Sequence, residues 1–372
     1  MRVIIAVAHG GIYSGGAHQA LYALRGLKRA GVEVMAVWGP DVDGDPHGLD
    51  RLKDLDISLE IIPMNDTLNL STLKQFRKIL NEFKPDVVEC FKSGAQYHAL
   101  FGGIGLNQHA IIFYRGISRN MDVWQGLKYR LRRVDRIIAN CEDLKWIMSK
   151  TGKIPPEKID FVHGEFDPAF SNPDSVDGSG FRNELNIPED VMLITQLGNW
   201  SEWRGQGVTL KAAAILKEKG YRFHLLFCGR ETDKLRDQVD NLALSDVVTL
   251  SLYRRDPERV LKATNIAVNA STSHESLPGS LINIIAMGIP AIASDVPGSN
   301  MIVRDGVNGY IIQPGDSDLL AQSLMKLLNM DESKLNEMSK AARQRALDLF
   351  SSDIRTSCRL KVYERAIEHR RQ

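Results

Sequence analysis

The chain has 372 residues, of which 43% are hydrophobic and 25% charged, and its formal net charge is +1. This is the composition of an ordinary soluble globular protein, long enough for two domains, with no overall charge that would attract nucleic acid or a membrane. No apolar run approaches the ~18 residues of a spanning helix. The first apolar run is too short for a signal peptide, and the four cysteines are far apart, as free thiols in a reducing compartment are. We therefore expect a cytoplasmic protein, at most peripheral on the inner face of the membrane, with no nucleic-acid partner.

Short apolar runs alternate with amphipathic stretches through the first half of the chain. The runs that predict β-strands are residues 2–8, 32–38, 60–64, 86–91, 110–116, 136–141 and 158–164. Continuous apolar strands that alternate with helices are typical of a parallel sheet covered on both faces. Residues 165–185 are rich in Pro, Gly, Ser and Asp, as a linker would be.

The same pattern restarts after this linker. Strands are predicted at residues 191–199, 222–229, 247–253, 265–271, 290–295 and 308–314, and residues 353–372 form one more amphipathic helix. The sequence therefore predicts an α/β protein with two doubly wound domains, residues 1–170 and residues 185–350.

A glycine-rich loop follows the first predicted strand. It reads HGGIYSGGAHQ, and Gly15 and Gly16 lead directly into a helix. Glycine lets the backbone approach a ligand closely, and a helix N-terminus offers free amides, so an anion or phosphate is the expected guest. The alternative is a tight turn that needs glycine for its geometry alone. The loop is not GxGxxG, and no acidic residue ends the second strand, which argues against a dinucleotide cofactor.

Arg204 follows the strand at 191–199, near the start of a helix. A guanidinium group there can bind two phosphate oxygens at once, although a solvated surface arginine fits the same position.

The stretch HESLPGSLINIIAMGIP, residues 274–290, follows the strand at 265–271 and leads into a helix. The amides of Gly279, Ser280 and Leu281 would be unsatisfied at the helix start and would suit a diphosphate. Glu275 should then face something neutral or cationic, such as sugar hydroxyls. The alternative is that Glu275 is a simple loop residue and Ser280 a plain N-cap.

These motifs, in their order and spacing, resemble the retaining glycosyltransferases of the GT-B fold known as family 4 or group 1. The family pattern S-x-x-E-G-x-P-x-x-x-x-E-A-x-A-x-G-x-P corresponds to SHESLPGSLINIIAMGIP. LGNWSEWRGQ resembles the phosphate-anchoring stretch of the family, and SDVPGSNMIVRDGVNGYIIQPGD resembles the stretch after its glutamate motif. GGIYSGGAHQAL resembles the family's glycine loop. The resemblance covers nearly the whole chain.

The resemblance implies two Rossmann-like domains that face each other across a cleft. Residues 1–170 would bind the acceptor, residues 185–350 would bind the nucleotide-sugar donor, and the helix at 353–372 would pack back on the first domain. The chain would move a sugar from a nucleotide-sugar to a surface-glycan or lipid-linked saccharide acceptor, in cell-envelope polysaccharide or lipopolysaccharide synthesis, with the anomeric configuration retained. No His pairing of metal-ligand spacing is evident, so we expect neither a metal nor another cofactor.

The resemblance also implies the site residues. The catalytic residues would be Glu275, Arg204 and Arg115. The donor would be bound by Gly15, Gly16, Asn199, Arg204, Tyr253, Arg254, Glu275, Ser276, Leu277, Pro278, Gly279, Ser280, Leu281 and Asn283, with the nucleobase read by backbone groups around Tyr253 and Arg254.

Four positions depart from the family pattern. Asn283 stands where the family has a ribose-binding glutamate, Asn199 where it has a phosphate-binding arginine, and Met301 where it has a further glutamate. Arg115 stands where a histidine is common. The departures indicate an altered donor or lost activity. A sugar-nucleotide epimerase of the same fold and a non-catalytic sugar-nucleotide binding protein are therefore alternatives.

Residues 115–136 are strongly basic, with seven basic and two acidic residues. Trp124, Leu127, Tyr129 and Leu131 are interleaved with them, so the segment reads as a basic amphipathic helix that could contact an anionic membrane or an acidic glycan. The alternative is a solvated helix face whose apolar residues lie in the core. The residues predicted for this acceptor or membrane patch are His18, Arg119, Lys128, Arg130, Arg132 and Arg133.

Overall fold

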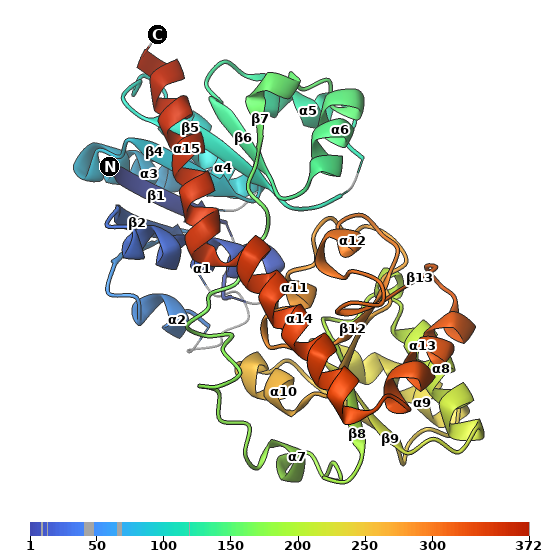
Figure 1. Cartoon of the computed structure of the whole chain (residues 1–372). Helices are drawn as coiled ribbons and strands as arrows, with labels where there is room; N and C mark the ends of the chain where they lie inside the picture. Colours follow the sequence, from blue (N-terminus) through green and yellow to red (C-terminus); the bar gives the residue numbers. More distant parts are fainter. Residues whose placement is uncertain (9, 13, 41–47, 65–68, 119, 372) are drawn as a thin grey trace. The chain divides into compact units, whose positions relative to one another are not determined.

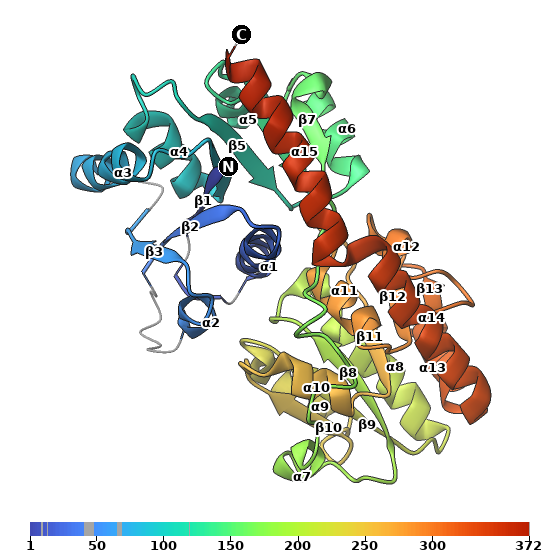
Figure 2. The same ribbon diagram turned by 60° about the vertical axis from the view of Figure 1, so that its left-hand side comes forward.

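The computed structural model describes residues 1–8, 10–12, 14–40, 48–64, 69–118 and 120–371. The chain divides into two compact units, Met1–Asp167 with Ser351–Gln372, and Pro168–Phe350. Each unit contains one parallel β-sheet with helices on its faces (Figures 1 and 2). The predicted fold class, α/β with two doubly wound Rossmann-like sheets, is therefore confirmed. The cleft between the two domains stays a prediction.

The first unit is built on a seven-stranded sheet of strand order β3-β2-β1-β4-β5-β6-β7. Each apolar run predicted as a strand in this half overlaps one of these strands, because buried parallel strands are continuously apolar. Their bounds are β1 Arg2–Val7, β2 Glu33–Trp38, β3 Ser58–Ile61, β4 Val87–Phe91, β5 Ala110–Arg115, β6 Arg136–Ala139 and β7 Ile159–Phe161.

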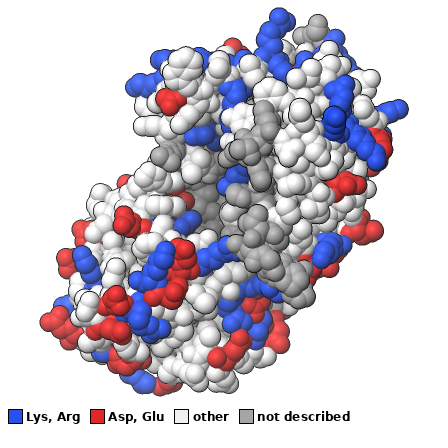
Figure 3. Space-filling model, turned by 180° about the vertical axis from the view of Figure 1, so that it is seen from behind, with Lys and Arg blue, Asp and Glu red and all other residues white. Residues whose placement is uncertain are grey.

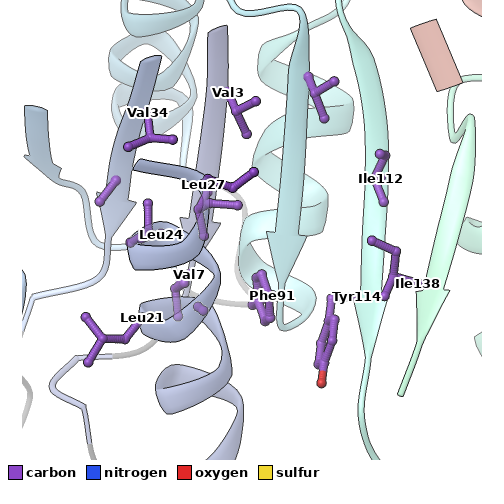
Figure 4. Packing of buried hydrophobic residues seen from close by; sticks show 14 of the residues in the cluster. Val3, Val7, Leu21, Leu24, Leu27, Val34, Phe91, Ile112, Tyr114 and Ile138 are labelled. Carbon is purple, nitrogen blue, oxygen red and sulfur yellow. The ribbon is translucent and has the colours of Figure 1, made fainter. Parts of the chain in front are cut away.

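Helices cover both faces of this sheet. On one face, Leu21, Leu24 and Leu27 of α1 pack over Val3 and Val7 of β1 (Figure 4). These leucines recur every three residues on one side of α1, and the valines alternate on one side of the strand, so both patterns present one apolar surface. The helices of the unit are α1 Gly15–Arg29, α2 Asp50–Lys53, α3 Leu70–Phe83, α4 Ser93–Gly102, α5 Val123–Arg130, α6 Glu142–Thr151, the 3-10 helix η1 Pro156–Lys158 and α15 Ser352–Arg371.

The last helix, α15, returns to the first unit and lies beside α1 (Figures 1 and 2). Its Arg359 is fully buried and binds two buried carboxylates, Glu89 of β4 at 2.5 Å and Glu165 after β7 at 2.6 Å. The hydroxyl of Tyr363 also donates to Glu89. Burial raises the pKa of Glu165, and the charge of Arg359 opposes that rise. The helix therefore supplies the cation that two core carboxylates of this unit need.

The second unit repeats the design with six strands in the order β10-β9-β8-β11-β12-β13. The strands are β8 Met192–Leu197, β9 Phe223–Cys228, β10 Val248–Ser251, β11 Ile266–Asn269, β12 Ala291–Ser294 and β13 Gly309–Ile312. The helices are α7 Phe181–Glu184, η2 Glu202–Arg204, α8 Gln206–Glu218, η3 Thr232–Leu235, α9 Arg236–Asn241, α10 Pro257–Ala263, α11 Gly279–Ala286, α12 Ser299–Ile302, α13 Ser317–Leu328 and α14 Glu332–Phe350. All six strands predicted for this half are present.

Candidate functional site

The topology of the second sheet selects one place for a ligand. From β8 the chain builds the sheet outward through β9 and β10, and then returns to place β11 on the other side of β8. Ligands of doubly wound sheets bind outside the carboxyl ends of the two strands at such a reversal. The loop with Arg204 follows β8, and the loop with Glu275 follows β11. The two predicted catalytic residues of this unit therefore come from the two strands that the rule selects.

Arg204 and Glu275 contact each other directly. The guanidinium Nη1 of Arg204 lies 3.2 Å from Oε1 of Glu275, and the hydroxyl of Ser271 donates to the same oxygen at 3.1 Å. The Glu275 side chain is buried, whereas that of Arg204 is partly exposed and stacks on the ring of Trp203 at 4.5 Å. Burial raises the pKa of Glu275, and the Arg204 charge and the Ser271 hydrogen bond oppose the rise. Arg204 can therefore face a ligand while it holds the Glu275 carboxylate in place.

The backbone that carries Arg204 is fixed from behind. Gln196 of β8 donates to the Arg204 carbonyl oxygen at 2.8 Å and accepts from the Thr209 hydroxyl at 2.7 Å, and both side chains are buried. Gly205 has φ 68°, and a Cβ there would overlap the carbonyl of Ala270. Sequence reasoning missed Ser271, Gln196 and Thr209. The signal for Gln196 and Thr209 was a polar side chain at a position that the apolar pattern assigns to the core.

The start of α11 presents free backbone amides. The N-cap residue is Pro278, which makes no side-chain capping hydrogen bond, and the first helical hydrogen bond runs from the amide of Ile282 to the Pro278 carbonyl at 3.2 Å. The amides of Gly279, Ser280 and Leu281 thus precede the hydrogen-bonded part of the helix, as an anion site requires. The alternative that Ser280 is the N-cap is wrong, because Pro278 is the N-cap and Ser280 is the second residue of the helix.

The loop in front of α11 is packed tightly against α12. Ser276 and Leu277 are buried. Gly298, the N-cap of α12, has φ 80°, and a Cβ on it would overlap the carbonyl oxygen of Ser276. Sequence reasoning missed this support, although the turn-forming PGSN sequence after β12 marks the position.

Other predicted donor residues have structural partners. The Asn199 side chain accepts from the Arg230 amide at 3.0 Å, which ties the loop after β8 to the loop after β9. Arg254 binds Asp256 and Glu184, each at 2.8 Å, so its side chain is directed toward carboxylates of its own unit. These pairs raise the pKa of Arg254.

Three more positions singled out from the sequence lie after β10, on α11 and on α12. Tyr253 lies under Arg230, with the guanidinium 5.8 Å from the ring centre. Asn283 is half-buried on the second turn of α11, and Met301 lies on α12.

The remaining predicted residues lie in the first unit. Gly15 and Gly16 are the first residues of α1, which Ser14 caps. His18 lies on the next turn, and burial lowers its pKa to about 4, so it is neutral at pH 7. Arg115 ends β5 and is half-buried. Sequence reasoning missed Lys92, which follows β4 with φ 74° and whose Cε would lie 3.5 Å from a Cβ on Gly16.

The basic segment 115–136 is not one helix in the structure, because α5 ends at Arg130. Lys128 donates to Ser93 at 2.9 Å, and Arg133 lies 2.7 Å from His109 Nε2, so both side chains contact their own unit. Arg130 is half-buried, Arg132 is exposed, and Arg119 lies outside the described residues. On the face shown in Figure 3, basic side chains are mixed with acidic ones over much of the surface.

Candidate metal sites and membrane-spanning helices are both absent from the described part of the chain. In that part, no three His, Cys, Asp or Glu residues are grouped so that they could hold a metal ion. None of its helices is both long and apolar enough to cross a bilayer.

Comparisons with known proteins agree with the geometry. A family profile described as "Glycosyl transferases group 1" matches residues 179–345, and one described as "Glycosyltransferase Family 4" matches residues 13–170. The capsular polysaccharide biosynthesis glycosyltransferase CapM of Staphylococcus aureus is 25% identical over 351 residues, which are 88% of this chain and 90% of CapM. The lipopolysaccharide core biosynthesis glycosyltransferase LpsE of Rhizobium meliloti is 26% identical, over 49% of this chain and about half (52%) of its own.

Solved structures share the fold over nearly the full length. A glycosyltransferase from Rickettsia africae superposes with a TM-score of 0.83 at 18% identity and covers 99% of each chain. Anabaena Alr3699/HepE, solved in complex with UDP and glucose, has a TM-score of 0.81 at 17% identity and covers 97% of this chain and 98% of its own.

Proposed function

The chain belongs to the group 1 glycosyl transferases, family 4, and on that premise we propose that it transfers a sugar from a UDP-sugar to a saccharide acceptor of a surface polysaccharide or lipopolysaccharide. The UDP-sugar is supported by HepE, whose structures hold UDP and glucose or UDP-glucose. The acceptor class is supported by CapM and LpsE. A lipid-linked acceptor would bring the protein into peripheral contact with the inner face of an anionic membrane.

The observation that carries the proposal is the pairing of Arg204 with Glu275, a residue of the loop that leads into the free amides of α11. A diphosphate would bind these amides, and the guanidinium of Arg204 would lie between that anion and the Glu275 carboxylate. Glu275 would then be kept from the phosphate by a cation and would remain available to the sugar hydroxyls. This arrangement separates two negative groups that would otherwise repel each other within one site.

The chemistry follows from this placement. The bond between the anomeric carbon and the diphosphate oxygen breaks while the acceptor hydroxyl attacks the same face of the sugar, and the hydroxyl proton passes to the leaving diphosphate. Negative charge grows on the leaving diphosphate, and Arg204 and the amides of residues 279–281 would stabilise it. Fixed donors that face a developing charge are usually the largest single contribution to such a rate. In the first unit, Gly15, Gly16 and Arg115 are the candidates for contacts with the donor from the acceptor side.

The first experiment is a thermal-shift screen of the protein with UDP-, GDP- and ADP-sugars, followed by a transfer assay with the sugar that stabilises it. We expect UDP-sugars to raise the melting temperature. Conversion of the donor without acceptor would instead indicate an epimerase, and binding without turnover in an acceptor extract would indicate a binding protein. A protein that no nucleotide sugar stabilises would contradict the proposal.

Variants test the two residues directly. Glu275→Gln keeps the shape of the buried side chain and should lower transfer by roughly 10²–10³-fold, as the loss of one preorganised polar contact does in other enzymes. Arg204→Lys keeps one positive charge but cannot bind two groups in the same way, and we expect a comparable loss. Glu202→Ala removes an exposed carboxylate from the same short helix η2 and is the matched control. Wild-type rates in either variant would remove that residue from the site.

A further inference from the structure

Helix α5 carries an exposed apolar stripe. The exposed fractions are 81% for Trp124, 49% for Leu127 and 41% for Leu131, the residue directly after the helix. Residues three apart lie on the same side of a helix, so Trp124 and Leu127 form one stripe, and Leu131 is exposed directly after the helix ends. Such a run of large apolar side chains at one edge of a soluble unit marks an interaction surface more often than scattered exposure does.

The opposite side of α5 is fixed to the unit, so the stripe cannot turn inward. Tyr129 is buried, with its ring edge-on to Phe113 of β5 at 5.6 Å. Gly126 is also buried, and a Cβ on it would overlap the carbonyl oxygen of Gly152 at the end of α6. Figure 1 shows α5 and α6 next to each other. The close contact at Gly126 sets the rotation of the helix and holds the tryptophan outward.

Charge next to the stripe favours an anionic partner. Arg132 is exposed beside Leu131, and the guanidinium of Arg130 donates to the carbonyl of Val123 at 3.0 Å, which keeps it at the N-terminal end of the stripe. The acidic side chain here, Asp122, caps the helix through the Gln125 amide at 2.7 Å. The stripe is therefore bordered by arginines, while its neighbouring carboxylate is engaged with the backbone.

We propose that this stripe inserts into the interfacial layer of an anionic lipid bilayer, an inference that rests on the proposed transfer to a lipid-linked acceptor. A tryptophan ring is amphipathic and suits the headgroup level, and arginines at its border match anionic headgroups. An eight-residue helix cannot cross a bilayer, but it can lie in the plane of its surface. The contact is then made mainly by apolar side chains. This differs from the basic helix expected from the sequence, because Lys128 and Arg133 contact their own unit.

An apolar contact with the bilayer and an electrostatic one differ in their response to salt. Attraction between exposed charges is largely screened at ~0.5 M salt, whereas burial of apolar surface is not. Sedimentation of the full chain with phosphatidylglycerol–phosphatidylethanolamine vesicles should therefore show binding that weakens at 0.5 M NaCl but persists. The double variant Trp124→Ala/Leu127→Ala should weaken the binding by roughly ten- to hundredfold. Leu70→Ala, a change at a side chain that is 77% exposed at the start of α3, should leave it unchanged.

Three outcomes decide whether the stripe inserts into an anionic bilayer. Binding that vanishes at 0.5 M NaCl and ignores the double variant would overturn the inference in favour of a purely electrostatic contact. Failure to bind vesicles, together with self-association that the double variant abolishes, would assign the stripe to a second copy of the chain and also overturn it. Vesicle binding through Trp124 in a protein that no nucleotide sugar stabilises would uphold the stripe and refute the proposed transfer instead.

Discussion

Gly298 offers a test of how the loop before α11 is positioned. This glycine has φ 80°, and a Cβ on it would overlap the carbonyl oxygen of Ser276 in that loop. The substitution Gly298→Ala therefore forces a movement of backbone against backbone, because neither partner has a flexible side chain that could yield. Gly315 has φ 82° with nothing within 4 Å of a Cβ, so Gly315→Ala creates the same backbone strain without the collision.

The two variants separate the free-energy cost of backbone strain from that of the collision with Ser276. A left-handed conformation costs an ordinary residue roughly 1–2 kcal/mol, and both variants incur that cost. Overpacking adds roughly 1–3 kcal/mol, and only Gly298→Ala incurs it. At ~3 °C for each kcal/mol, the middle of the range for a unit of this size, Gly315→Ala should lower the melting temperature by roughly 3–6 °C. Gly298→Ala should lower it by roughly 6–15 °C.

The functional consequence is measured on the same samples. The collision in Gly298→Ala pushes Ser276 and the residues that precede the free amides. The variant should therefore bind UDP roughly tenfold or more weakly, which is the effect of losing one charge-assisted hydrogen bond. Gly315→Ala should bind UDP as the wild type does. Calorimetric titration at a temperature where both variants are folded is the assay. Equal melting temperatures, or unchanged UDP affinity in Gly298→Ala, would refute the argument that this glycine sets the loop.

Two further substitutions test other parts of the molecule. Asn283→Glu should tighten UDP binding in calorimetric titration, since a carboxylate makes stronger hydrogen bonds with ribose hydroxyls than an amide does; unchanged or weaker binding would mean that the ribose is held elsewhere. Arg359→Leu should destabilise the first unit by about 3–5 kcal/mol in urea denaturation, because Glu89 and Glu165 would lose their buried cation. Burial raises the pKa of Glu165 and Arg359 opposes that rise, so without Arg359 the folded chain takes up a proton at a higher pH than the wild type does. The loss of unfolding free energy in Arg359→Leu, relative to the wild type, should therefore become smaller as the pH is lowered from 7 to 5. A loss that does not change with pH would contradict this account.

The strands of both sheets could be predicted because burial on both faces leaves a continuous apolar run. The place of the candidate site could also be predicted, since the ends of β8 and β11 follow from strand order once the fold is known. The pairing of Arg204 with Glu275 could not. The two residues are 71 positions apart, and their contact depends on which way a long side chain turns at the edge of the sheet.

The basic segment shows a second limit. Sequence spacing treats residues 115–136 as one helix, so every arginine is assigned a place on one helical face. The structure ends α5 at Arg130, and after that point helical spacing no longer decides which side chains face the unit. Arg133 and Arg136 then contact groups of their own unit, whereas Trp124, Leu127 and Arg132 are exposed. The end of a helix is among the least reliable predictions from sequence, and here it determines which side chains this surface exposes.

The position of α15 has a consequence for synthesis on the ribosome. Domains usually fold in the order in which they emerge, but the first unit lacks Arg359 until the whole of Pro168–Phe350 has been made. At ~5–20 residues per second that interval lasts roughly 10–40 s. During it, the carboxylates of Glu89 and Glu165 have no buried cation, and the surface of the first sheet that α15 later covers is open to water. The second unit, whose strands and helices are contiguous in the chain, has no such wait. The unit translated second can therefore complete its fold first, and the nascent N-terminal half is the part that would need protection by a chaperone.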